Sequence, residues 1–182
     1  MTKKERAPRN RTLTVSDSES ARFAEKLLVD TGKANLELEA ILNKTVLGDT
    51  IEVLKRLPDS IFDLIIIDPP YNLNKDFHGF KFKSSDDRAY VEYLETWFIN
   101  VVRTMKPNAS LYLCGDWKNS ATLYEVMNRH LTVLNRITWQ REKGRGAKTN
   151  WKNAMEDIWF GVKNKAEYYF DIDSVKMKRK VI

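Results

Sequence analysis

The stretch FDLIIIDPPYNLN, from Phe62 to Asn74, decides how this chain is expected to fold. Phe62–Ile67 is almost continuously apolar, which is typical of a strand buried on both faces of a parallel sheet. Asp68-Pro69-Pro70-Tyr71 follows at once, although proline cannot donate a hydrogen bond to a sheet ladder. A carboxylate at the end of a buried strand also needs a partner. The residues after the strand therefore suit a ligand better than they suit the sheet. A rigid exit from the strand, with Tyr71 closing an edge of the core, is the alternative.

The segments on either side of this strand indicate an α/β fold. Apolar runs and amphipathic stretches alternate along the chain, with Pro58 and Pro107 ending two of the helices. The expected order is a strand at 45–47, a helix at 50–57, the strand at 62–67, a loop at 73–85, a helix at 86–106, a strand at 109–117, a helix at 118–129, and strands at 133–140 and 155–163. This order predicts a mostly parallel sheet with an antiparallel edge strand.

Two of these helices carry clear apolar stripes. The long helix is expected to bury Tyr90, Leu94, Trp97, Val101 and Met105. The next helix is expected to turn Leu123, Tyr124 and Met127 inward. These stripes predict that both helices pack on the sheet.

The first 44 residues are expected to add a tail and accessory helices. Residues 1–15 form a basic tail that solvent or phosphates would surround. Ser16 and Glu19 have the spacing of a capping box, which predicts a helix over 16–30. A second short helix is expected within 35–44. Residues 45–182 then form the main domain.

Composition narrows the functional classes. The net charge of +6 favours a polyanionic partner. The one cysteine, Cys114, excludes an internal disulfide and suits a reducing, cytoplasmic compartment. No apolar run is long enough to span a membrane, the N-terminus lacks the apolar core of a signal peptide, and no Cys/His cluster indicates a metal.

The DPPY sequence at Asp68–Tyr71, placed directly after a buried strand, is similar to the signature of S-adenosylmethionine-dependent DNA amino-methyltransferases. These enzymes methylate the exocyclic nitrogen of adenine (N6) or cytosine (N4). VLGDTIEVLKRLPDSIFDLIIIDPPYNL, residues 46–73, resembles the opening of the permuted, β-class members, and the resemblance spans about residues 45–175. It implies a Rossmann-like methyltransferase sheet. Aspartate before Pro-Pro-Tyr implies adenine, with N4-cytosine as the alternative.

The resemblance implies roles that the chemistry explains. An exocyclic amino group is a poor nucleophile, and acceptors aimed at its two N–H bonds would favour the reactive geometry. The Asp68 carboxylate is one such acceptor and the Pro69 carbonyl the other, in a turn that Pro69 and Pro70 make rigid. Tyr71 would stack on the base, which has to leave the duplex first.

Gly48-Asp49 resembles the family's segment beside the adenine of S-adenosylmethionine. Gly48 would allow close approach, Asp49 would accept a hydrogen bond from the cofactor, and Asp68 and Pro69 would face its methionine end. An N-cap for the following helix explains Asp49 equally well.

The stretch QREKGRGAKTNWK, residues 140–152, is expected to be a basic loop that contacts DNA phosphates through Arg141, Lys143, Arg145 and Lys148. A solvated loop without a ligand is the alternative. Gly144 and Gly146 precede no helix, which argues against a cofactor loop. His78 and Phe82 belong to a loop that would act as a lid or a minor stacking platform near the base, although a histidine such as His78 is more often an ordinary loop residue than a catalyst. Trp117 would line the pocket or simply follow an Asp116 helix cap.

The glycine-rich turn that the family uses for the cofactor has no counterpart among the seven glycines. The chain is therefore expected to be the catalytic part of an incomplete methyltransferase. The implied partners are double-stranded DNA and a complementing C-terminal segment or second chain, with a homodimer as one form of the complete enzyme. A non-catalytic DNA-binding or assembly module on the same fold is the other class of function.

Overall fold

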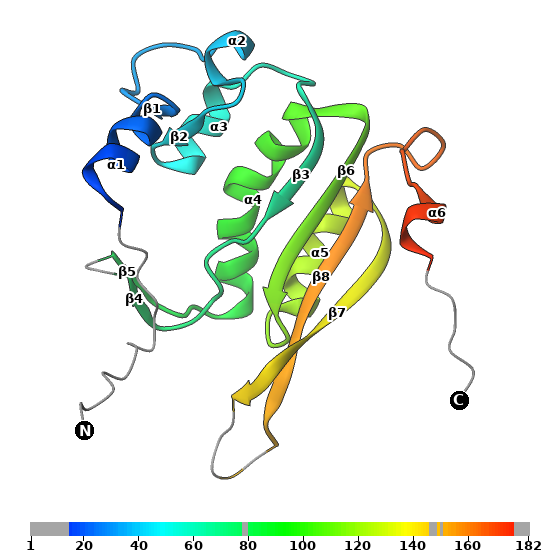
Figure 1. The fold of residues 1–182 in the computed structure, drawn as a ribbon. Helices are drawn as coiled ribbons and strands as arrows, with labels where there is room; N and C mark the ends of the chain where they lie inside the picture. Colours follow the sequence, from blue (N-terminus) through cyan, green and yellow to red (C-terminus); the bar gives the residue numbers. More distant parts are fainter. Residues whose placement is uncertain (1–14, 78–79, 146–148, 150, 177–182) are drawn as a thin grey trace, which may run out of the picture.

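The computed structural model describes residues 15–77, 80–145, 149 and 151–176. A four-stranded sheet in the order β3-β6-β8-β7 forms its centre, as Figure 1 shows. Its strands are β3 (Phe62–Ile67), β6 (Met105–Asp116), β8 (Asn153–Val162) and β7 (Thr132–Arg145). The helices are α1 (Asp17–Ala24), α2 (Leu38–Ile41), α3 (Thr50–Arg56), α4 (Asp87–Thr104), α5 (Ser120–His130) and α6 (Ile172–Val175).

The directions of the strands confirm the α/β class. β3 pairs with β6 in parallel, and β8 runs antiparallel to both β6 and β7. β3, β6 and β7 therefore share one direction, as a mostly parallel sheet requires. The opposed strand, β8, lies inside the sheet and not at its edge. Phe160, Gly161 and Val162 are buried in β8, whereas β7 is largely exposed, so β8 takes the inner place.

One face of the sheet carries the core. α4 and α5 cover this face (Figure 1), and the five residues of the predicted α4 stripe are all buried. On α5, Leu123 and Met127 are buried as expected, but Tyr124 is not. Val126 takes the inward position, and Tyr124 packs on Trp159 with ring centroids 4.9 Å apart.

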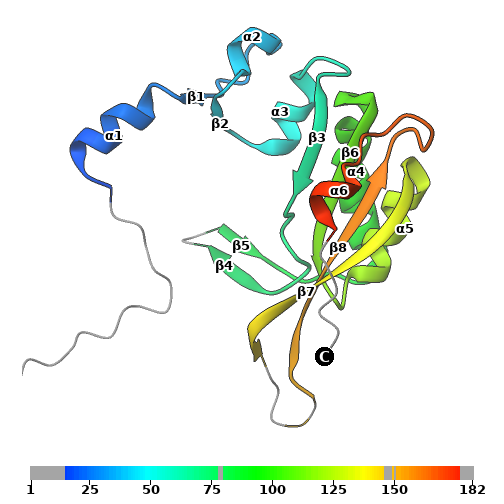
Figure 2. The same ribbon diagram turned by 45° about the vertical axis from the view of Figure 1, so that its right-hand side comes forward.

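The opposite face, called the open face below, is covered in part by the segment around α6. Figure 2 shows α6 in front of the sheet. Phe160 contacts Tyr168 and Phe170 there and stacks on Tyr112. Over β3, by contrast, Leu64 is 53% exposed and Ile66 is 68% exposed. The prediction of a strand buried on both faces is therefore wrong within the described ranges, because no described segment covers β3 on this side.

The N-terminal part differs from the expected pair of helices. α1 begins with the predicted capping box, in which Ser16 and Glu19 exchange bonds. It ends at Ala24, however, and Leu27–Val29 is a strand, β1. β1 pairs in parallel with β2 (Thr45–Leu47) as a separate two-stranded sheet. α2 is also shorter than the predicted 35–44 helix.

An ion pair between Asp30 and Arg56 joins the end of β1 to α3. The small β1–β2 sheet therefore belongs with α3, and Figure 1 shows the two together beside α4.

Two predicted loops contain regular structure. The 73–85 segment holds a hairpin of β4 (Lys75–Phe77) and β5 (Phe80–Phe82). β7 continues to Arg145, so much of the predicted basic loop is strand. Figure 2 shows the β7–β8 hairpin extending past the end of the sheet. Each helix in the described ranges is too short or too polar to span a membrane.

Candidate functional site

Asp68 lies at the carboxyl end of β3 and on the open face. Ile65 and Ile67 pack on the core, so the alternation of a strand turns Ile66 and Asp68 to the other side. Ile67 is paired with Leu113, which places Asp68 level with Cys114 of β6. Carboxyl ends of strands are where open α/β sheets bind ligands. The position of Asp68 is therefore the one that the sequence suggested.

Tyr71 is held beside this carboxylate. Burial raises the pKa of the Tyr71 hydroxyl well above its usual value, and the charge of Asp68 and a hydrogen bond to its carboxylate raise it further. The charges of Glu156 and Cys114 act in the same direction. Tyr71 is therefore a neutral hydrogen-bond donor at physiological pH, with its ring next to Asp68.

The two prolines hold the turn between these side chains. Pro69 is buried, and the carbonyl of Pro70 accepts a hydrogen bond from the Tyr90 hydroxyl at 3.1 Å. Burial, with a smaller effect of Tyr93, raises the pKa of Tyr90 to about 12, which keeps this donor protonated. α4 thus fixes the turn from behind, and the fixed φ of proline adds to its rigidity.

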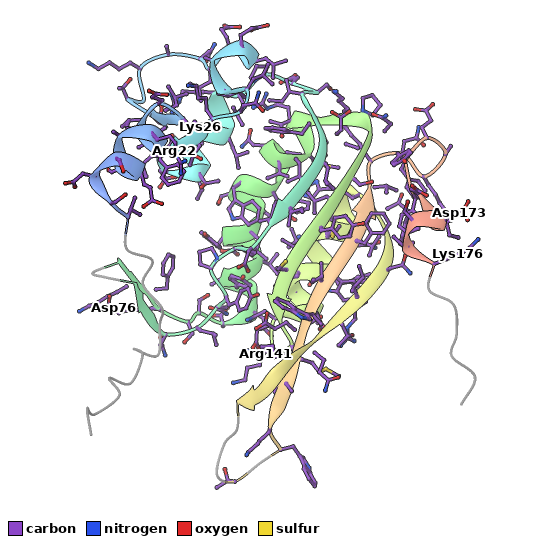
Figure 3. All side chains as sticks on the ribbon, viewed as in Figure 1. Arg22, Lys26, Asp76, Arg141, Asp173 and Lys176 are labelled. Carbon is purple, nitrogen blue, oxygen red and sulfur yellow. The ribbon has the colours of Figure 1, made fainter. Side chains whose placement is uncertain are left out.

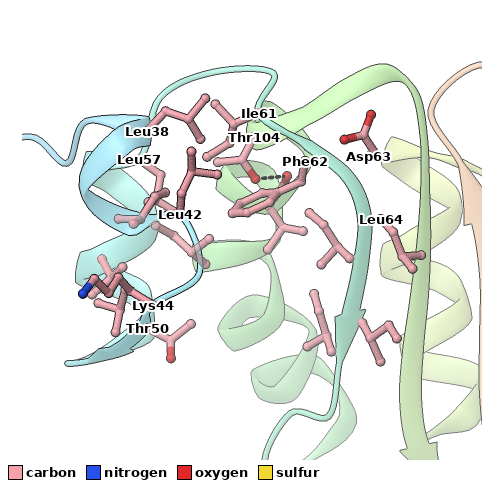
Figure 4. Close-up of a pocket in the computed structure, with 18 of the residues that line it drawn as sticks. Leu38, Leu42, Lys44, Thr50, Leu57, Ile61, Phe62, Asp63, Leu64 and Thr104 are labelled. Carbon is pink, nitrogen blue, oxygen red and sulfur yellow. Dashed lines mark hydrogen bonds between the residues drawn. The ribbon is translucent and has the colours of Figure 1, made fainter. Parts of the chain in front are cut away.

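A cavity of about 820 Å³ lies between β3 and the α2–β2–α3 region. Figure 4 shows its mainly apolar wall, to which Leu38, Leu42, Leu57 and Phe62 contribute. Gly48 and Asp68 both line it. Gly48 and Asp49 were one predicted cofactor-binding pair, and Asp68 and Pro69 were the other. One residue of each pair therefore lines the same cavity, whose volume is of the size that small molecules occupy.

Gly48 and Asp49 also have structural roles. A Cβ at Gly48 would lie 2.8 Å from the Cβ of Asp30, so glycine is needed for this packing whatever it binds. Asp49 is the N-cap of α3 and accepts bonds from the amides of Ile51 and Glu52. The helix-cap interpretation of Asp49 is thus confirmed. Burial raises the pKa of the Tyr93 hydroxyl, and the charge of Asp49 raises it further.

The β4–β5 hairpin lies close to the candidate site, as expected of this segment. A second cavity of about 210 Å³ is lined by Pro70, Tyr71, Phe82 and Tyr90, among others. Asn72 closes the base of the hairpin: its amide donates to the Ser85 carbonyl and accepts from the Ser85 amide, both at 2.8 Å. His78 lies outside the described residues.

Arg141 does not lie in a loop. It belongs to β7, and its Nη1 donates to Oε1 of Glu156 on β8 at 2.8 Å. Both side chains are about four-fifths buried, at 20% and 18% exposed. Figure 3 labels Arg141 where the β7–β8 hairpin leaves the sheet. The side chains of Lys143 and Arg145, and all of Lys148, lie outside the described residues.

Glu156 was missed by the reasoning from sequence. Its carboxylate raises the pKa of both Tyr71 and Cys114, after the larger effect of burial in each case. The signal was available, since Glu156 and Asp157 are two adjacent acids in a strand with an apolar end. Buried charges of this kind need partners: Arg141 serves Glu156 on the open face and Arg136 serves Asp157 on the core face, the latter at 2.9 Å.

Trp117 is 52% exposed just beyond β6. Asp116 accepts from the Lys118 amide at 2.9 Å, but the N-cap of α5 is Asn119, so the prediction of an Asp116 helix cap is wrong by three residues. The bond to Lys118 forms a turn before the helix instead.

At one end of the sheet, the open face therefore presents a hydrogen-bond acceptor, Asp68, and the aromatic ring of Tyr71. The Arg141–Glu156 ion pair lies on the same face, and the large apolar cavity lies beside Asp68. Asp68 can accept hydrogen bonds from a ligand, and the ring of Tyr71 can stack on a planar one. The turn contributes to both cavities, since Asp68 lines the larger one and Tyr71 the smaller one.

Comparison with known proteins identifies relatives with related sequences. Type II methyltransferase M.HpaI of Haemophilus parainfluenzae is 27% identical over 139 residues, which cover 75% of this chain and 44% of the relative. DNA adenine methyltransferase YhdJ of Escherichia coli K12 is 29% identical over 139 residues, covering 75% and 47%. Type II methyltransferase M.BglII of Bacillus subtilis is 31% identical over 153 residues, covering 76% and 40%. The chain spans less than half the length of each of these three relatives.

Solved structures share the fold. The cytosine-N4-specific PvuII DNA methyltransferase matches 66% of this chain and 49% of its own, with a TM-score of 0.51 and 18% identity. The complex of M1.HpyAVI with SAM matches 72% and 61%, with a TM-score of 0.50 and 17% identity. The family model for DNA methylases of the N6/N4 type matches residues 62–181, which begin with β3 and include the whole four-stranded sheet. This chain therefore belongs to the N6/N4 DNA methylase family.

Proposed function

We propose that this chain is the catalytic part of a DNA methyltransferase, which moves a methyl group from S-adenosylmethionine to the N6 amino group of an adenine flipped out of double-stranded DNA. The observation that carries the proposal is the placing of Asp68 and Tyr71 together at the carboxyl end of β3, beside the 820 Å³ cavity. A DNA-binding module without catalysis is the weaker alternative, because binding alone does not require this turn.

The geometry supports different roles for the residues of the turn. Tyr71 offers its ring to the flipped base, and stacking of this kind contributes about 1–3 kcal/mol per base. Asp68 and the Pro69 carbonyl accept from the amino group, which favours the tetrahedral nitrogen needed for attack. Because Tyr90 holds Pro70 in place, these acceptors need little reorganisation during the reaction.

The described residues fit the cofactor. S-adenosylmethionine, when bound, supplies an electrophilic methyl group on a positively charged sulfur. The apolar cavity suits its adenosine part, Gly48 lines one end, and the carboxylate of Asp68 offers a negative charge at the other. Asp49 adds an acceptor near Gly48, although the α3 amides already use one of its oxygens.

Adenine is the favoured base. One relative, which is 29% identical, is a DNA adenine methyltransferase, and the aspartate at position 68 resembles the adenine-specific signature. N4-cytosine is the second candidate because the family includes both kinds of enzyme. The same two acceptors would serve either amino group.

The proposed partners are double-stranded DNA and a segment that completes the sheet. Arg141, Lys143, Arg145 and Lys148 lie on or near the β7–β8 hairpin, which we propose contacts DNA. The other edge of β3 has no strand partner among the described residues, and Leu64 and Ile66 are exposed. A further segment of the same protein, or a second chain, would pair there. A DNA substrate and a free thiol at Cys114 agree with a cytoplasmic site of action.

The proposal predicts the effect of Asp68→Ala. We expect this variant, assayed with the completing segment, to lose at least about a hundredfold in methyl transfer, because it removes an acceptor that acts on the amino group. Its binding to DNA should change little, since Asp68 faces the base and not the phosphates. Transfer of a labelled methyl group to DNA and a parallel binding titration would measure both. Equal turnover by the variant and the parent would refute the assignment.

A further inference from the structure

Trp151 lies between β7 and β8, just before β8 begins. β8 starts at Asn153, which is the partner of Arg145 on β7. The side chain of Trp151 is 96% exposed, the largest exposed fraction among the large apolar side chains of the described ranges. Tryptophan has a large apolar area, and leaving it in water forgoes the stabilisation that burial would give. Packing within the described fold therefore does not explain this residue.

The register of the sheet places Trp151 well beyond the candidate site. Cys114 pairs with Ile158, and Asp68 lies level with Cys114. Asn153 precedes Ile158 by five residues, which is about 17 Å of strand at about 3.4 Å per residue. β8 is antiparallel to β6, so this length runs outward past the carboxyl ends of β3 and β6, as Figure 2 shows. Stacked rings have centroids about 4.5–7 Å apart, so Trp151 is too distant to stack on a base held by Asp68.

The charge around Trp151 favours nucleic acid as its partner. Residues 140–152 contain five Lys or Arg residues and one acid, Glu142. Arg141 is paired with Glu156, and the other four still outnumber the acid. Lys152, the neighbour of Trp151, is exposed. Aromatic rings among basic side chains are typical of surfaces that bind the backbone by charge and the bases by stacking.

Base flipping provides a place for such a ring. A base that leaves the duplex gives up its stacking and pairing, which costs free energy. A planar side chain in the vacated space would stack on the two neighbouring bases, and apolar side chains inserted between base steps hold distorted duplexes in other DNA-binding proteins. With the target base at Asp68, the duplex would lie outward of the sheet, in the direction in which the β7–β8 hairpin extends.

We propose that Trp151 inserts into the duplex, in the space that the flipped base leaves. Lys152 contacts a phosphate beside it. The inference rests on the function proposed above, and it gives the hairpin a second role besides its phosphate contacts. Trp151 is a positioning residue in this role, because it keeps the duplex open and does not touch the reacting atoms.

The test uses the full chain and two labelled DNA duplexes of one sequence. One duplex is intact, and the other carries a single central abasic site made with tetrahydrofuran. The abasic duplex presents the vacated space without base flipping and without knowledge of the target sequence. Affinity is read from fluorescence anisotropy. We expect the parent to bind the abasic duplex about tenfold more tightly than the intact one, which is the effect of stacking an aromatic side chain on a base.

Trp151→Ala should reduce this preference to within about twofold, whereas Trp151→Phe should keep a preference of at least about threefold because a ring remains. The fold should tolerate both changes, since the side chain is 96% exposed. The salt slope of Trp151→Ala should equal that of the parent, because stacking releases no counterion.

Two variants serve as controls. Lys152→Met removes the neighbouring charge but keeps the ring, so it should lower the salt slope by about one and leave the tenfold preference unchanged. Tyr169→Ala removes an exposed ring outside the hairpin, where the side chain is 77% exposed. Its preference and its salt slope should both equal those of the parent.

Four results would overturn the inference. If the parent binds the two duplexes equally well, Trp151 does not enter the vacated space, while the proposed function stands. If Trp151→Ala keeps the preference, the preference reflects the flexibility of the abasic duplex. If Lys152→Met or Tyr169→Ala removes the preference as fully as Trp151→Ala does, the ring of Trp151 is not its source. If the parent binds neither duplex, the proposed contact with DNA fails, and the proposed function falls with the inference.

Discussion

Tyr71 and Asp68 are partners before any base is present. Burial, the charge of Asp68 and hydrogen bonding to its carboxylate raise the pKa of the Tyr71 hydroxyl, and the same carboxylate is proposed to accept from the amino group. A base that stacks on Tyr71 therefore competes with the Tyr71 hydroxyl for Asp68. In the proposed function, this hydroxyl would orient the carboxylate until the base arrives, whereas stacking would require only the ring.

Substitution at Tyr71 separates these two roles. In the completed enzyme, we expect Tyr71→Phe to keep methyl transfer within about threefold of the parent, because the ring remains. Tyr71→Ala should reduce it by about 5- to 150-fold, as loss of about 1–3 kcal/mol of stacking implies. Steady-state methyl transfer measures both, and Tyr124→Ala serves as a control because Tyr124 packs on Trp159 of the core face. A Tyr71→Phe variant as impaired as Tyr71→Ala would show that the hydroxyl is essential.

At the scale of the elements, β3 has two unlike faces. Ile65 and Ile67 pack on the core, whereas Leu64 and Ile66 face solvent. Exposed apolar side chains on an unpaired strand usually mark a contact surface. We infer that the open face of β3 meets the completing segment.

Ile66→Lys tests this inference. In the isolated chain we expect thermal stability to change little, because Ile66 is 68% exposed. Association with the completing segment should fall at least tenfold, since a charge would be buried in an apolar contact. Ile67→Lys is the contrasting variant and should unfold the chain. Unimpaired association of Ile66→Lys, measured by titration of the two parts, would place the contact elsewhere.

Some of the helices and strands could be predicted from the sequence, and others could not. The stripe on α4 and the apolar run before Asp68 were sufficient to place both, because each pattern extends over several turns or residues. β1 was not predictable, since Leu27 and Leu28 continue the apolar spacing of a capped helix. Its strand form depends on pairing with β2, which is a tertiary contact.

The ion pair of Arg141 was hidden for a related reason. Arg141 reaches Glu156 because β7 pairs with β8 in a register that places Trp139 opposite Glu156, and this register is a tertiary feature. Simple alternation along the sequence therefore cannot show that Arg141 and Glu156 meet. The turn at Asp68–Tyr71, by contrast, could be recognised from four adjacent residues, although Tyr90 of α4 also holds it in place.

At the scale of the whole molecule, the two sheets are separate. Among the described residues, no strand lies between the β1–β2 sheet and the four-stranded sheet, and the 820 Å³ cavity lies between them. The wall formed by α2, β2 and α3 is accordingly joined to β3 by few main-chain bonds. A cofactor in this cavity would contact β3, which the four-stranded sheet holds in place, and the wall of α2, β2 and α3, which is held less firmly.

We therefore expect residues 1–182 alone to bind S-adenosylmethionine weakly or not at all, with a dissociation constant above about 1 mM. Addition of the completing segment should restore affinity by supplying the missing side of the cavity. Calorimetric titration of a monodisperse, monomeric sample is the measurement, with S-adenosylhomocysteine as a second ligand. Micromolar binding together with methyl transfer by the isolated chain would show that the described elements are sufficient.

The Asn72–Ser85 clamp has a further consequence. The side-chain amide of Asn72 makes both bonds across the base of the β4–β5 hairpin. These two bonds offset the entropic cost of closing the loop at the point where the hairpin begins. Loop-closure entropy grows slowly with length, so residues inserted or deleted beyond the clamp would leave Asp68–Tyr71 where they are. The turn at Asp68–Tyr71 can thus accept hairpins of many sizes, and evolution can change the hairpin without rebuilding the turn beneath it.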